Sequence, residues 1–440
     1  MSGESRIRTV VLTVQYSTRT SYYLDWSEAF AQSPLFEATT FNLFSRDRRR
    51  AARRAIEDAE LVVALHACSA DTLEFIKPLL GALKLRRGRF LMLVTNEYNV
   101  PWARIADKRD FLRDTGADYV GTQLPLETGQ WLYADTGARV LALPHALNDA
   151  VFRRDKPDPT RAIDIGGRSA RYPVFIGDDE RNRALDVFAG IAPAAGLRVD
   201  IDTRSRLDRP GWAAFLNDCR ATVGTEAGSW YLERDDRTAL AIREFLRNRP
   251  GVRTIRADGL LHSATRRLPY HLKTWLRALV KFSPMRHEAL DDSGVSFEEI
   301  EARFFSGYPR CPMYSKAISS RHFDAAGTGT CQILVRGRYN DILQAGEHYI
   351  AVNPDMSDAR QAIERFSDPV ERRRIAESAY ALVHDGHTYR HRTAALHEML
   401  SGGPSPPPSP RSRGEGGAPG ASEMRHPAGA RTRAPRGAGG

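Results

Sequence analysis

The chain has 440 residues, of which 42% are hydrophobic and 27% charged, a composition that excludes a wholly disordered or membrane-embedded protein. Its length exceeds one typical domain, so two are expected. The formal net charge of +10 favours anionic ligands such as nucleotide diphosphates, or an anionic membrane surface, whereas no interleaved basic and aromatic motif indicates nucleic acid.

The four cysteines are scattered, without the spacing of a zinc site, so free thiols in a reducing compartment are expected. The N-terminus enters a strand without a signal-peptide segment, and no stretch approaches about 20 consecutive apolar residues. We therefore expect a cytoplasmic protein, with peripheral contact with the inner face of the membrane as a further option.

The first half of the chain alternates strands with helices. Strands are predicted at 9–14, 61–65, 90–94, 119–120 and 139–143, and helices at 24–30, 47–59, 70–83, 106–114 and near 129. This alternation predicts a parallel, doubly wound sheet. Glu97 follows one of the strands at the edge where such sheets bind ligands; a loop cap is the favoured interpretation, with a catalytic base as the alternative.

The second half repeats the α/β pattern after a charged linker. The sequence predicts two Rossmann-like doubly wound domains that face a central cleft, with these boundaries: 1–150, a linker at 151–162, 163–385, a closing helix at 386–400 and a disordered tail at 401–440. In the first half of the chain, no Gly-x-Gly-x-x-Gly motif follows the first strand. This absence argues against an oxidoreductase that binds a dinucleotide.

Three stretches of this half are candidate ligand sites. Gly166, Gly167 and Arg168 end a strand, where the backbone can approach a phosphate while the arginine supplies charge; a tight turn is the alternative. Glu226, beside glycine at another strand end, is a candidate for acid–base work or sugar binding, with a structural cap as the alternative.

The third stretch runs from residue 319 to residue 330. Ser319 or Ser320 is expected to cap a helix that carries Arg321 and Asp324, and Gly327 is expected to end it. Its positive N-terminal end suits a phosphate, although an ordinary αβ unit has the same pattern.

Residues 321–330 (RHFDAAGTGT), 339–340 (YN) and 346–350 (GEHYI) resemble the C-terminal block of group 1 glycosyltransferases, closest to spore-maturation-type and surface-polysaccharide members. Three further segments are similar to parts of that family. Residues 143–148 (LPHALN) resemble the crossover that ends its N-terminal domain, and residues 224–230 (GTEAGSW) resemble a segment that faces its cleft. Residues 386–392 (GHTYRHR) resemble its closing segment. The resemblance implies the two-domain GT-B fold.

The resemblance also implies roles for single residues. Asp324 would hold the nucleotide ribose, Ser319 and Ser320 would face the diphosphate, and Thr328 is a weaker phosphate contact. Glu226 would bind the sugar or act as a catalytic residue, and His145 would contact sugar or phosphate. This chain has Asp324 where Glu is usual, and a lysine at position 316 where many relatives carry another Glu.

The expected function is transfer of a sugar from a nucleotide-sugar donor to a glycan or other cell-surface acceptor. No metal site and no cofactor beyond the donor are expected, and the acidic stretches 177–180 and 234–236 are interpreted as solvated loops. Alternatives on the same fold are a non-catalytic sugar-nucleotide or polysaccharide-binding protein and a sugar-nucleotide epimerase. No nucleic-acid partner is expected.

Overall fold

The computed structural model describes residues 6–15, 22–248, 253–255, 285–287 and 295–401. All the helices and strands described below belong to one compact unit. The sequence also predicts a helix at 272–281, which lies outside the described residues, and the predicted disordered tail (401–440) lies outside them from residue 402 onward.

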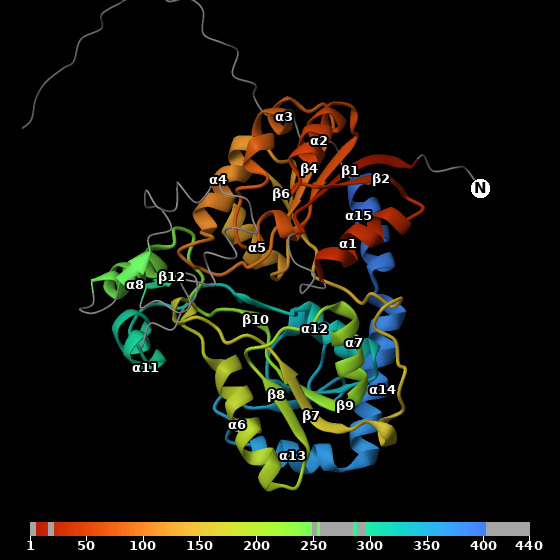
Figure 1. The fold of residues 1–440 in the computed structure, drawn as a ribbon, viewed down its shortest axis with the longest axis vertical. Coiled ribbons are helices and arrows are strands. Elements are labelled where there is room, and N and C mark those ends of the chain that lie inside the picture. The colour runs from red at the N-terminus through yellow and green to blue at the C-terminus, as the bar shows by residue number, and fades with distance from the viewer. Residues whose placement is uncertain (1–5, 16–21, 249–252, 256–284, 288–294, 402–440) are drawn as a thin grey trace, which may run out of the picture. The chain divides into compact units, whose positions relative to one another are not determined.

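The first large sheet, which we call the N-lobe together with its helices, has six parallel strands in the order β2-β1-β3-β4-β5-β6 (Figure 1). The strands are β1 (Ile7–Thr13), β2 (Phe36–Asn42), β3 (Leu61–Ala64), β4 (Arg89–Leu93), β5 (Tyr119–Thr122) and β6 (Arg139–Ala142). The helices are α1 (Tyr22–Gln32), α2 (Arg46–Asp58), α3 (Leu80–Leu85), α4 (Ile105–Thr115) and α5 (Leu126–Tyr133). The predicted alternation is confirmed here.

Both faces of this sheet are buried. Alternate strand residues point to opposite faces: Val62 and Met92 pack in the cluster that includes α2, α3 and α4, whereas Val63 and Leu91 pack in the cluster that includes α1. A parallel strand buried on both faces is apolar throughout, which is why the sequence shows β3 and β4 so clearly.

Two local features differ from the prediction. The sequence analysis misses β2, because this edge strand exposes Glu37, Thr39 and Thr40. The helix predicted over 70–83 is wrong for most of its length, since the α-helix begins only at Leu80. Pro78 lies in a short 3₁₀ turn just before it, where a residue without a backbone N–H interrupts regular helix.

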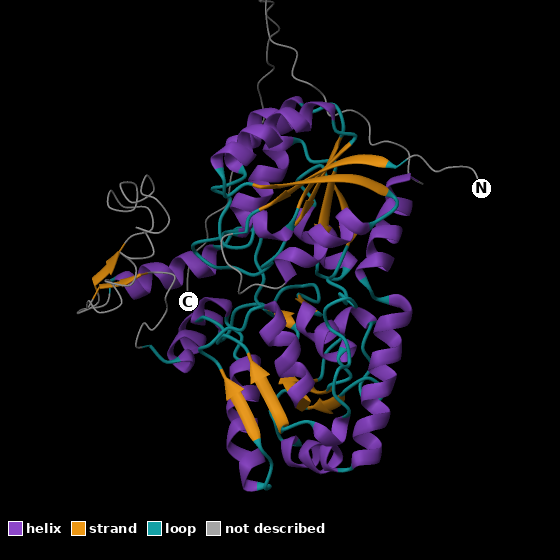
Figure 2. Cartoon of the chain, turned by 45° about the vertical axis from the view of Figure 1, so that its right-hand side comes forward, coloured by secondary structure: helices purple, strands orange, loops and turns teal. Residues whose placement is uncertain are grey.

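The second large sheet, which we call the C-lobe together with its helices, has five parallel strands in the order β15-β14-β9-β7-β8. They are β7 (Ile163–Arg168), β8 (Val199–Asp202), β9 (Cys219–Gly224), β14 (Cys331–Val335) and β15 (Ile350–Val352). The helices are α6 (Glu180–Ala194), α7 (Arg209–Asp218), α12 (Ser320–Gly327), α13 (Ala359–Ser367) and α14 (Pro369–Gly386). Figure 2 shows the strands of both sheets among their covering helices. Two Rossmann-like units are thus confirmed.

Shorter elements complete the described chain. A two-stranded antiparallel ladder joins β10 (Ala227–Gly228) to β13 (Lys316–Ala317), and β11 (Arg253–Ile255) pairs with β12 (Met285–His287). The sequence also predicts a helix at 238–247 and shows helical spacing over 288–305. Helix α8 (Arg237–Arg247) confirms the first, and α11 (Phe297–Ile300) is a single turn within the second.

In the described part of the chain, the segments around Leu147 and Thr388 connect the two lobes, and these two crossings touch. Leu147 forms an isolated parallel bridge with Thr388, and its backbone N–H donates to His387 O at 2.8 Å. After this crossing, α15 (Tyr389–Ser401) packs on α1 of the N-lobe, with Leu396 and Leu400 in the same apolar cluster as Trp26. The predicted closing helix therefore completes the first sheet's outer layer.

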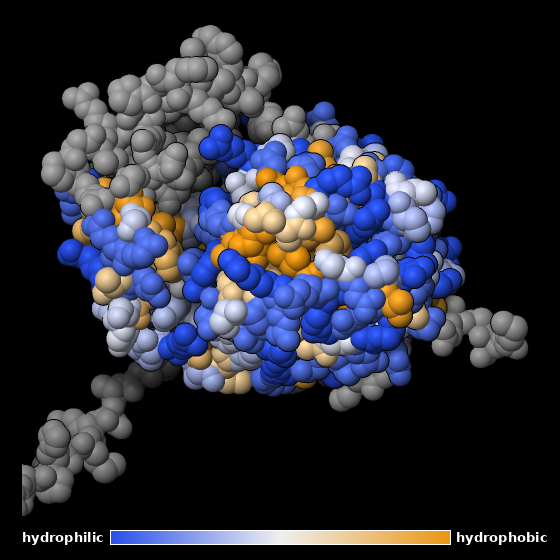
Figure 3. All heavy atoms as spheres, turned by 90° about the horizontal axis from the view of Figure 1, so that it is seen from below, coloured by the Kyte–Doolittle hydropathy of each residue, from blue (hydrophilic) through white to orange (hydrophobic). Residues whose placement is uncertain are grey.

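The face seen from below in Figure 3 is largely hydrophilic, with a hydrophobic patch at its centre. Across the described segments, no helix has both the length and the apolar character needed to cross a membrane. The four cysteines are free thiols, as expected, and Cys311 is the one that is partly exposed.

Candidate functional site

A hollow opens at the carboxyl edge of the second sheet, and we call it the C-lobe hollow. It contains about 450 Å³ of empty space, part of it open to solvent. Its walls come from β7, β9, β14, α6, α7 and α12: Gly167, Arg168, Ser169, Arg181, Leu185, Trp212, Thr222, Val223, Gly224, Thr225, Arg321, His322, Gln332 and Leu334. Ligands of open α/β sheets bind at this edge.

Arg168 enters the hollow from the end of β7. Its guanidinium donates to Asp200 through Nη1 to the backbone oxygen at 2.9 Å and through Nη2 to the carboxylate at 2.6 Å. The group also lies 4.2 Å from the ring centre of Phe215. Its buried Nε has no hydrogen-bond partner among the described residues.

Two further arginines reach the same hollow from helix starts. Arg321, in the first turn of α12, donates from Nη1 to Ser169 Oγ at 2.7 Å. Arg181, in the first turn of α6, is 7% exposed, and its guanidinium lies 3.8 Å from the ring centre of Tyr172. The sequence analysis missed Arg181, although its place at a helix start after the first strand of this lobe was a usable signal.

The start of α12 is organised as predicted. Ser319 is the N-cap residue and Ser320 the first helical one, and the Ser319 N–H donates to His322 Nδ1 at 3.0 Å. Burial, aided by the neighbouring Arg321 and Arg181, lowers the pKa of His322 to about 3, so this imidazole is neutral at pH 7. Neither serine lines the hollow, whereas the next two residues do.

The glycines of β7 differ in their surroundings. Both lie inside the strand rather than in a turn. A Cβ at Gly166 would meet Cys219 Sγ at 2.3 Å and Phe215 Cζ at 2.8 Å, so this glycine allows close packing behind the sheet. Gly167 lines the hollow. The tight-turn alternative is therefore wrong for both.

The end of α12 also corrects the sequence analysis. Gly327 is still helical, and a Cβ there would meet Leu147 Cδ1 at 2.2 Å. The left-handed residue is Gly329, with φ of 67°. Thr328 is fully buried, and its carbonyl accepts from Arg161 Nη2 at 2.6 Å. The length of the helix puts it roughly 10 Å from Arg321, and its phosphate contact stays a prediction.

Asp324 lies behind the wall of the hollow. Its Oδ2 accepts from Trp212 Nε1 at 3.0 Å, and Trp212 itself lines the hollow. Burial first, and then the nearby carboxylate of Asp25, raise the pKa of Asp324 well above its usual range. The ribose contact of Asp324 stays a prediction.

The predicted catalytic residues belong to separate networks. Glu226 Oε1 accepts from the Tyr339 N–H at 2.6 Å and Oε2 from the Tyr314 hydroxyl, and burial raises its pKa. His145 lies on the crossing, with Nε2 3.0 Å from Gln123 Nε2, and burial lowers its pKa to about 3. Neither lines the C-lobe hollow, and their catalytic roles stay predictions.

Residues 301–398, which include α12 and its N-terminal approach, match the model of a family described as glycosyl transferase-like. The chain carries a glycosyltransferase domain. The prediction of a glycosyltransferase from the motifs of this region is confirmed. Curated protein sequences give no match.

Several solved structures are similar in outline to this glycosyltransferase. Anabaena HepE in complex with UDP and glucose is 10% identical with a TM-score of 0.48, and covers 90% of this chain and 100% of its own. Sucrose-phosphate synthase from Thermosynechococcus elongatus is 12% identical with a TM-score of 0.43, and covers 90% and 98%. At such scores these structures do not define the ligands of this chain.

The acidic stretch at 177–180 of this glycosyltransferase is not a solvated loop. Lys316 Nζ lies 2.6 Å from Asp178 Oδ2 and 2.6 Å from Glu180 Oε2, and the lysine is 2% exposed. A buried ammonium requires such partners, so Lys316 and the two carboxylates form a buried, ion-paired anchor.

The second acidic stretch, at 234–236, also departs from the prediction. Asp236 is fully buried and accepts from the N–H groups of Ile105 and Ala106, at 3.1 and 2.9 Å. A carboxylate at a helix start satisfies free N–H groups there, so Asp236, which directly precedes α8, caps α4 of the N-lobe. Glu97, in contrast, is the expected loop cap, accepting from Thr122 Oγ1 at 2.6 Å.

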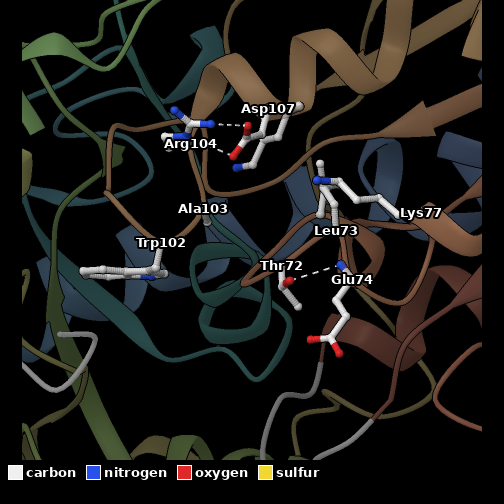
Figure 4. A pocket seen from close by; sticks show the side chains of 10 residues that line it. Thr72, Leu73, Glu74, Lys77, Trp102, Ala103, Arg104 and Asp107 are labelled. Atoms are coloured by element: carbon white, nitrogen blue, oxygen red, sulfur yellow. Dashed lines mark hydrogen bonds and ion pairs between the residues drawn. The ribbon is translucent and has the colours of Figure 1, made fainter. Parts of the chain in front are cut away.

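A second hollow, which we call the N-lobe hollow, lies beyond the carboxyl ends of β3 and β4 (Figure 4). It contains about 670 Å³ of empty space, part of it open to solvent, and is lined by Ser69, Thr72, Leu73, Glu74, Lys77, Trp102, Ala103, Arg104, Asp107 and Lys108. In Figure 4 the Trp102 ring stands opposite Leu73 and Lys77, and Arg104 turns to Asp107.

Most charges of the N-lobe hollow are already paired. Arg104 Nη2 donates to Asp107 Oδ1 at 2.5 Å. Lys108 Nζ donates to the carbonyls of Thr95 and Asn96, at 2.9 and 2.8 Å, and burial lowers its pKa to about 8. Among the described residues, no group of three or more His, Cys, Asp or Glu side chains is arranged to hold a metal ion.

Proposed function

We propose that this glycosyltransferase takes its sugar from a nucleotide-sugar donor whose diphosphate binds in the C-lobe hollow. The observation that carries the proposal is the convergence of Arg168, Arg181 and Arg321 on one hollow at the carboxyl edge of a parallel sheet. Guanidinium groups bind phosphate oxygens in a bidentate manner. In a site that is shielded from water, they stabilise charge that develops on a leaving group.

The proposed reaction exchanges one C–O bond for another. The acceptor hydroxyl oxygen forms a bond to the anomeric carbon. The bond from that carbon to the diphosphate oxygen breaks, and its electron pair stays on the nucleoside diphosphate. The acceptor proton passes to a base or to the departing phosphate. In this proposal the arginines, rather than a metal ion, meet the new charge on the diphosphate.

For the acceptor we propose a hydroxyl-rich molecule, a glycan or glycoconjugate, bound in the N-lobe hollow. Trp102 offers an aromatic wall there, and Thr72, Glu74 and Asp107 offer hydrogen-bonding groups. Aromatic walls with a few fixed polar groups are typical of small-molecule sites. Assembly of a cell-surface polysaccharide is the setting that this acceptor class suggests.

We further propose a cytoplasmic location with peripheral contact with an anionic membrane. Free and mostly buried thiols favour a reducing compartment. The net charge of +10 favours contact with an anionic surface.

The proposed function is tested by measuring turnover of nucleotide sugars. The full chain is incubated separately with UDP-glucose, UDP-galactose, UDP-N-acetylglucosamine and GDP-mannose, with and without cell-envelope glycans, and free nucleoside diphosphate is measured. Release that depends on an acceptor is expected with at least one donor. Binding without release would favour the non-catalytic alternative, and conversion of one sugar nucleotide into its epimer would favour the epimerase. Absence of UDP and GDP binding would overturn the proposed function.

A further inference from the structure

The N-lobe hollow has two walls, which come from separate segments of the chain. One wall is the stretch 102–108, which runs into α4, and the other is the stretch 69–77. Figure 4 shows Trp102 and Asp107 of the first wall apart from Leu73 and Lys77 of the second. The width of the hollow therefore depends on what holds the stretch 102–108, which we call the α4 wall.

A distant carboxylate holds the α4 wall. Asp236 Oδ1 accepts from the Ile105 N–H at 3.1 Å and Oδ2 from the Ala106 N–H at 2.9 Å. Both N–H groups belong to the first turn of α4, and Arg104, the N-cap residue of that helix, makes no side-chain capping bond in the described structure. A helix start needs such acceptors, so the backbone of this wall depends on Asp236.

Asp236 is itself fixed in an unusual conformation. It is fully buried, and its φ of 59° lies in the left-handed region, which few residues other than glycine adopt. Its Oδ1 also accepts from Asn99 Nδ2 at 2.7 Å, and the Asn99 side chain bonds both backbone groups of Glu233, at 2.8 and 2.9 Å. Such a conformation persists where the surrounding contacts determine it, so the carboxylate has one defined position against α4.

The segment that carries Asp236 continues to the other lobe. Helix α8 begins at the next residue, and its Ile242 is buried in one apolar cluster with Ala103 of the α4 wall and Phe175. Phe175 belongs to a short 3₁₀ turn between β7 and α6, and its ring meets the Trp102 ring edge-on, with 5.6 Å between the ring centres. The α4 wall is thus held between Asp236 and this turn.

Building on the proposed function, which places the acceptor in the N-lobe hollow, we propose that Asp236 is a positioning residue for the acceptor. By holding the start of α4, it sets the separation of the two walls and so aims the acceptor hydroxyl. Asp236 does not touch the acceptor, because its carboxylate faces backbone N–H groups and does not line the hollow. Donor binding in the C-lobe hollow does not depend on it.

The first experiment measures acceptor kinetics of the full chain, with the donor and the cell-envelope glycan that the parent chain turns over. Asp236→Gly removes the carboxylate and keeps the left-handed backbone accessible. It should lower kcat/KM for the acceptor about ten- to a hundredfold, the cost of a reactant misplaced by about 1 Å, mainly through a higher acceptor KM. Asp236→Asn, which keeps one side-chain oxygen, should lose less, and UDP affinity in calorimetry should be unchanged in both.

The neighbouring residue provides the matched control. Asp235 is exposed and pairs with Arg237 at 2.7 Å, so Asp235→Asn removes the same charge one position away and should leave the acceptor KM unchanged. Circular dichroism first establishes that each variant is folded. If Asp236→Gly is not folded, Asp236→Asn decides.

The second experiment measures hydrogen exchange and does not require turnover. In Asp236→Asn, amides of the α4 wall should exchange faster than in the parent chain, whereas those of residues 69–77 should be unchanged. Equal acceleration in both walls would mean a general loss of stability, and the positioning role would be wrong.

The outcomes separate this inference from the proposed function. If the parent chain shows acceptor-dependent release and the folded Asp236 variants keep its acceptor KM, the inference is overturned while the proposed function stands. A fall in kcat alone, in proportion to the fraction of folded protein, would also overturn it. Weaker UDP binding in these variants would contradict the independence of the two hollows.

Discussion

The N-lobe hollow lies beyond the carboxyl ends of β3 and β4, whereas the C-lobe hollow lies directly at the carboxyl edge of the second sheet. The charges of the two hollows are also arranged differently. In the N-lobe hollow, Arg104 pairs with Asp107 and the Lys108 ammonium is held by two backbone carbonyls. In the C-lobe hollow, Arg168 pairs with Asp200, but Arg168 and Arg181 each keep a buried N–H group that has no partner within the described part of the chain. In the proposed function, the fold provides the hollow in each lobe, and the pairing of charges decides which ligand that hollow takes.

The largest effect on UDP affinity is expected when arginines of the C-lobe hollow are replaced. Replacement of Arg168 and Arg321 together by Gln should weaken UDP binding by more than about a hundredfold, since each contributes a charged hydrogen bond of roughly 1.5–3 kcal/mol. Calorimetry measures the loss. The matched control is Arg104→Gln, which removes an arginine from the other hollow; a similar loss there would contradict the assignment of the donor to the C-lobe.

Replacement of Asp324 tests whether the residues directly behind the C-lobe hollow contribute to nucleotide binding. Asp324→Ala is expected to weaken nucleoside diphosphate binding by about 1–3 kcal/mol, either through a direct ribose contact or through Trp212, which its carboxylate holds. Trp212→Phe removes the indole N–H and keeps an aromatic ring. If it reproduces the loss, Asp324 acts through Trp212. Unchanged affinity of Asp324→Ala in calorimetry would remove the residue from the site.

The buried histidines are expected to make the free energy of unfolding depend on pH, with one such histidine on the crossing and one in the C-lobe. Burial lowers the pKa of His145 on the crossing and of His322 at the C-lobe hollow from 6.5 to about 3. Between these pH values the unfolded chain binds more protons than the folded one, so the free energy of unfolding should fall as the pH decreases from 6.5 towards 3. Urea titrations at pH 7, 5 and 4 measure the free energy of unfolding at each pH.

Replacement of either histidine by Gln should make this pH dependence shallower. A slope that does not change in His145→Gln would show that the imidazole is protonated in the folded state, contrary to its surroundings. The comparison with His322→Gln indicates which lobe loses more stability in acid.

The smallest expected effect is in the N-lobe hollow. Lys77 is exposed and Glu74 half-buried, so replacement of each by Gln should change the free energy of unfolding by less than about 0.5 kcal/mol and leave UDP affinity unchanged. The rate of acceptor-dependent diphosphate release should fall. Loss of UDP affinity instead would mean that the donor reaches the N-lobe hollow.

Sequence patterns alone predicted most features that depend on near neighbours in the chain. Hydrophobic periodicity located β3, β4 and β7, and the serine N-cap located the start of α12. The combination of a strand end and a helix start then selected Arg168 and Arg321, which line one hollow. Such signals act over a few residues, so the sequence contains them directly.

Only the tertiary structure decided the pairings between distant segments. Lys316 meets Glu180 across 136 residues, and Asp236 caps a helix of the other lobe across 131. These contacts turn two apparently solvated acidic stretches into buried anchors. A carboxylate that faces solvent and one that meets a buried cation have the same local sequence, because the path of the whole chain determines which partner is near.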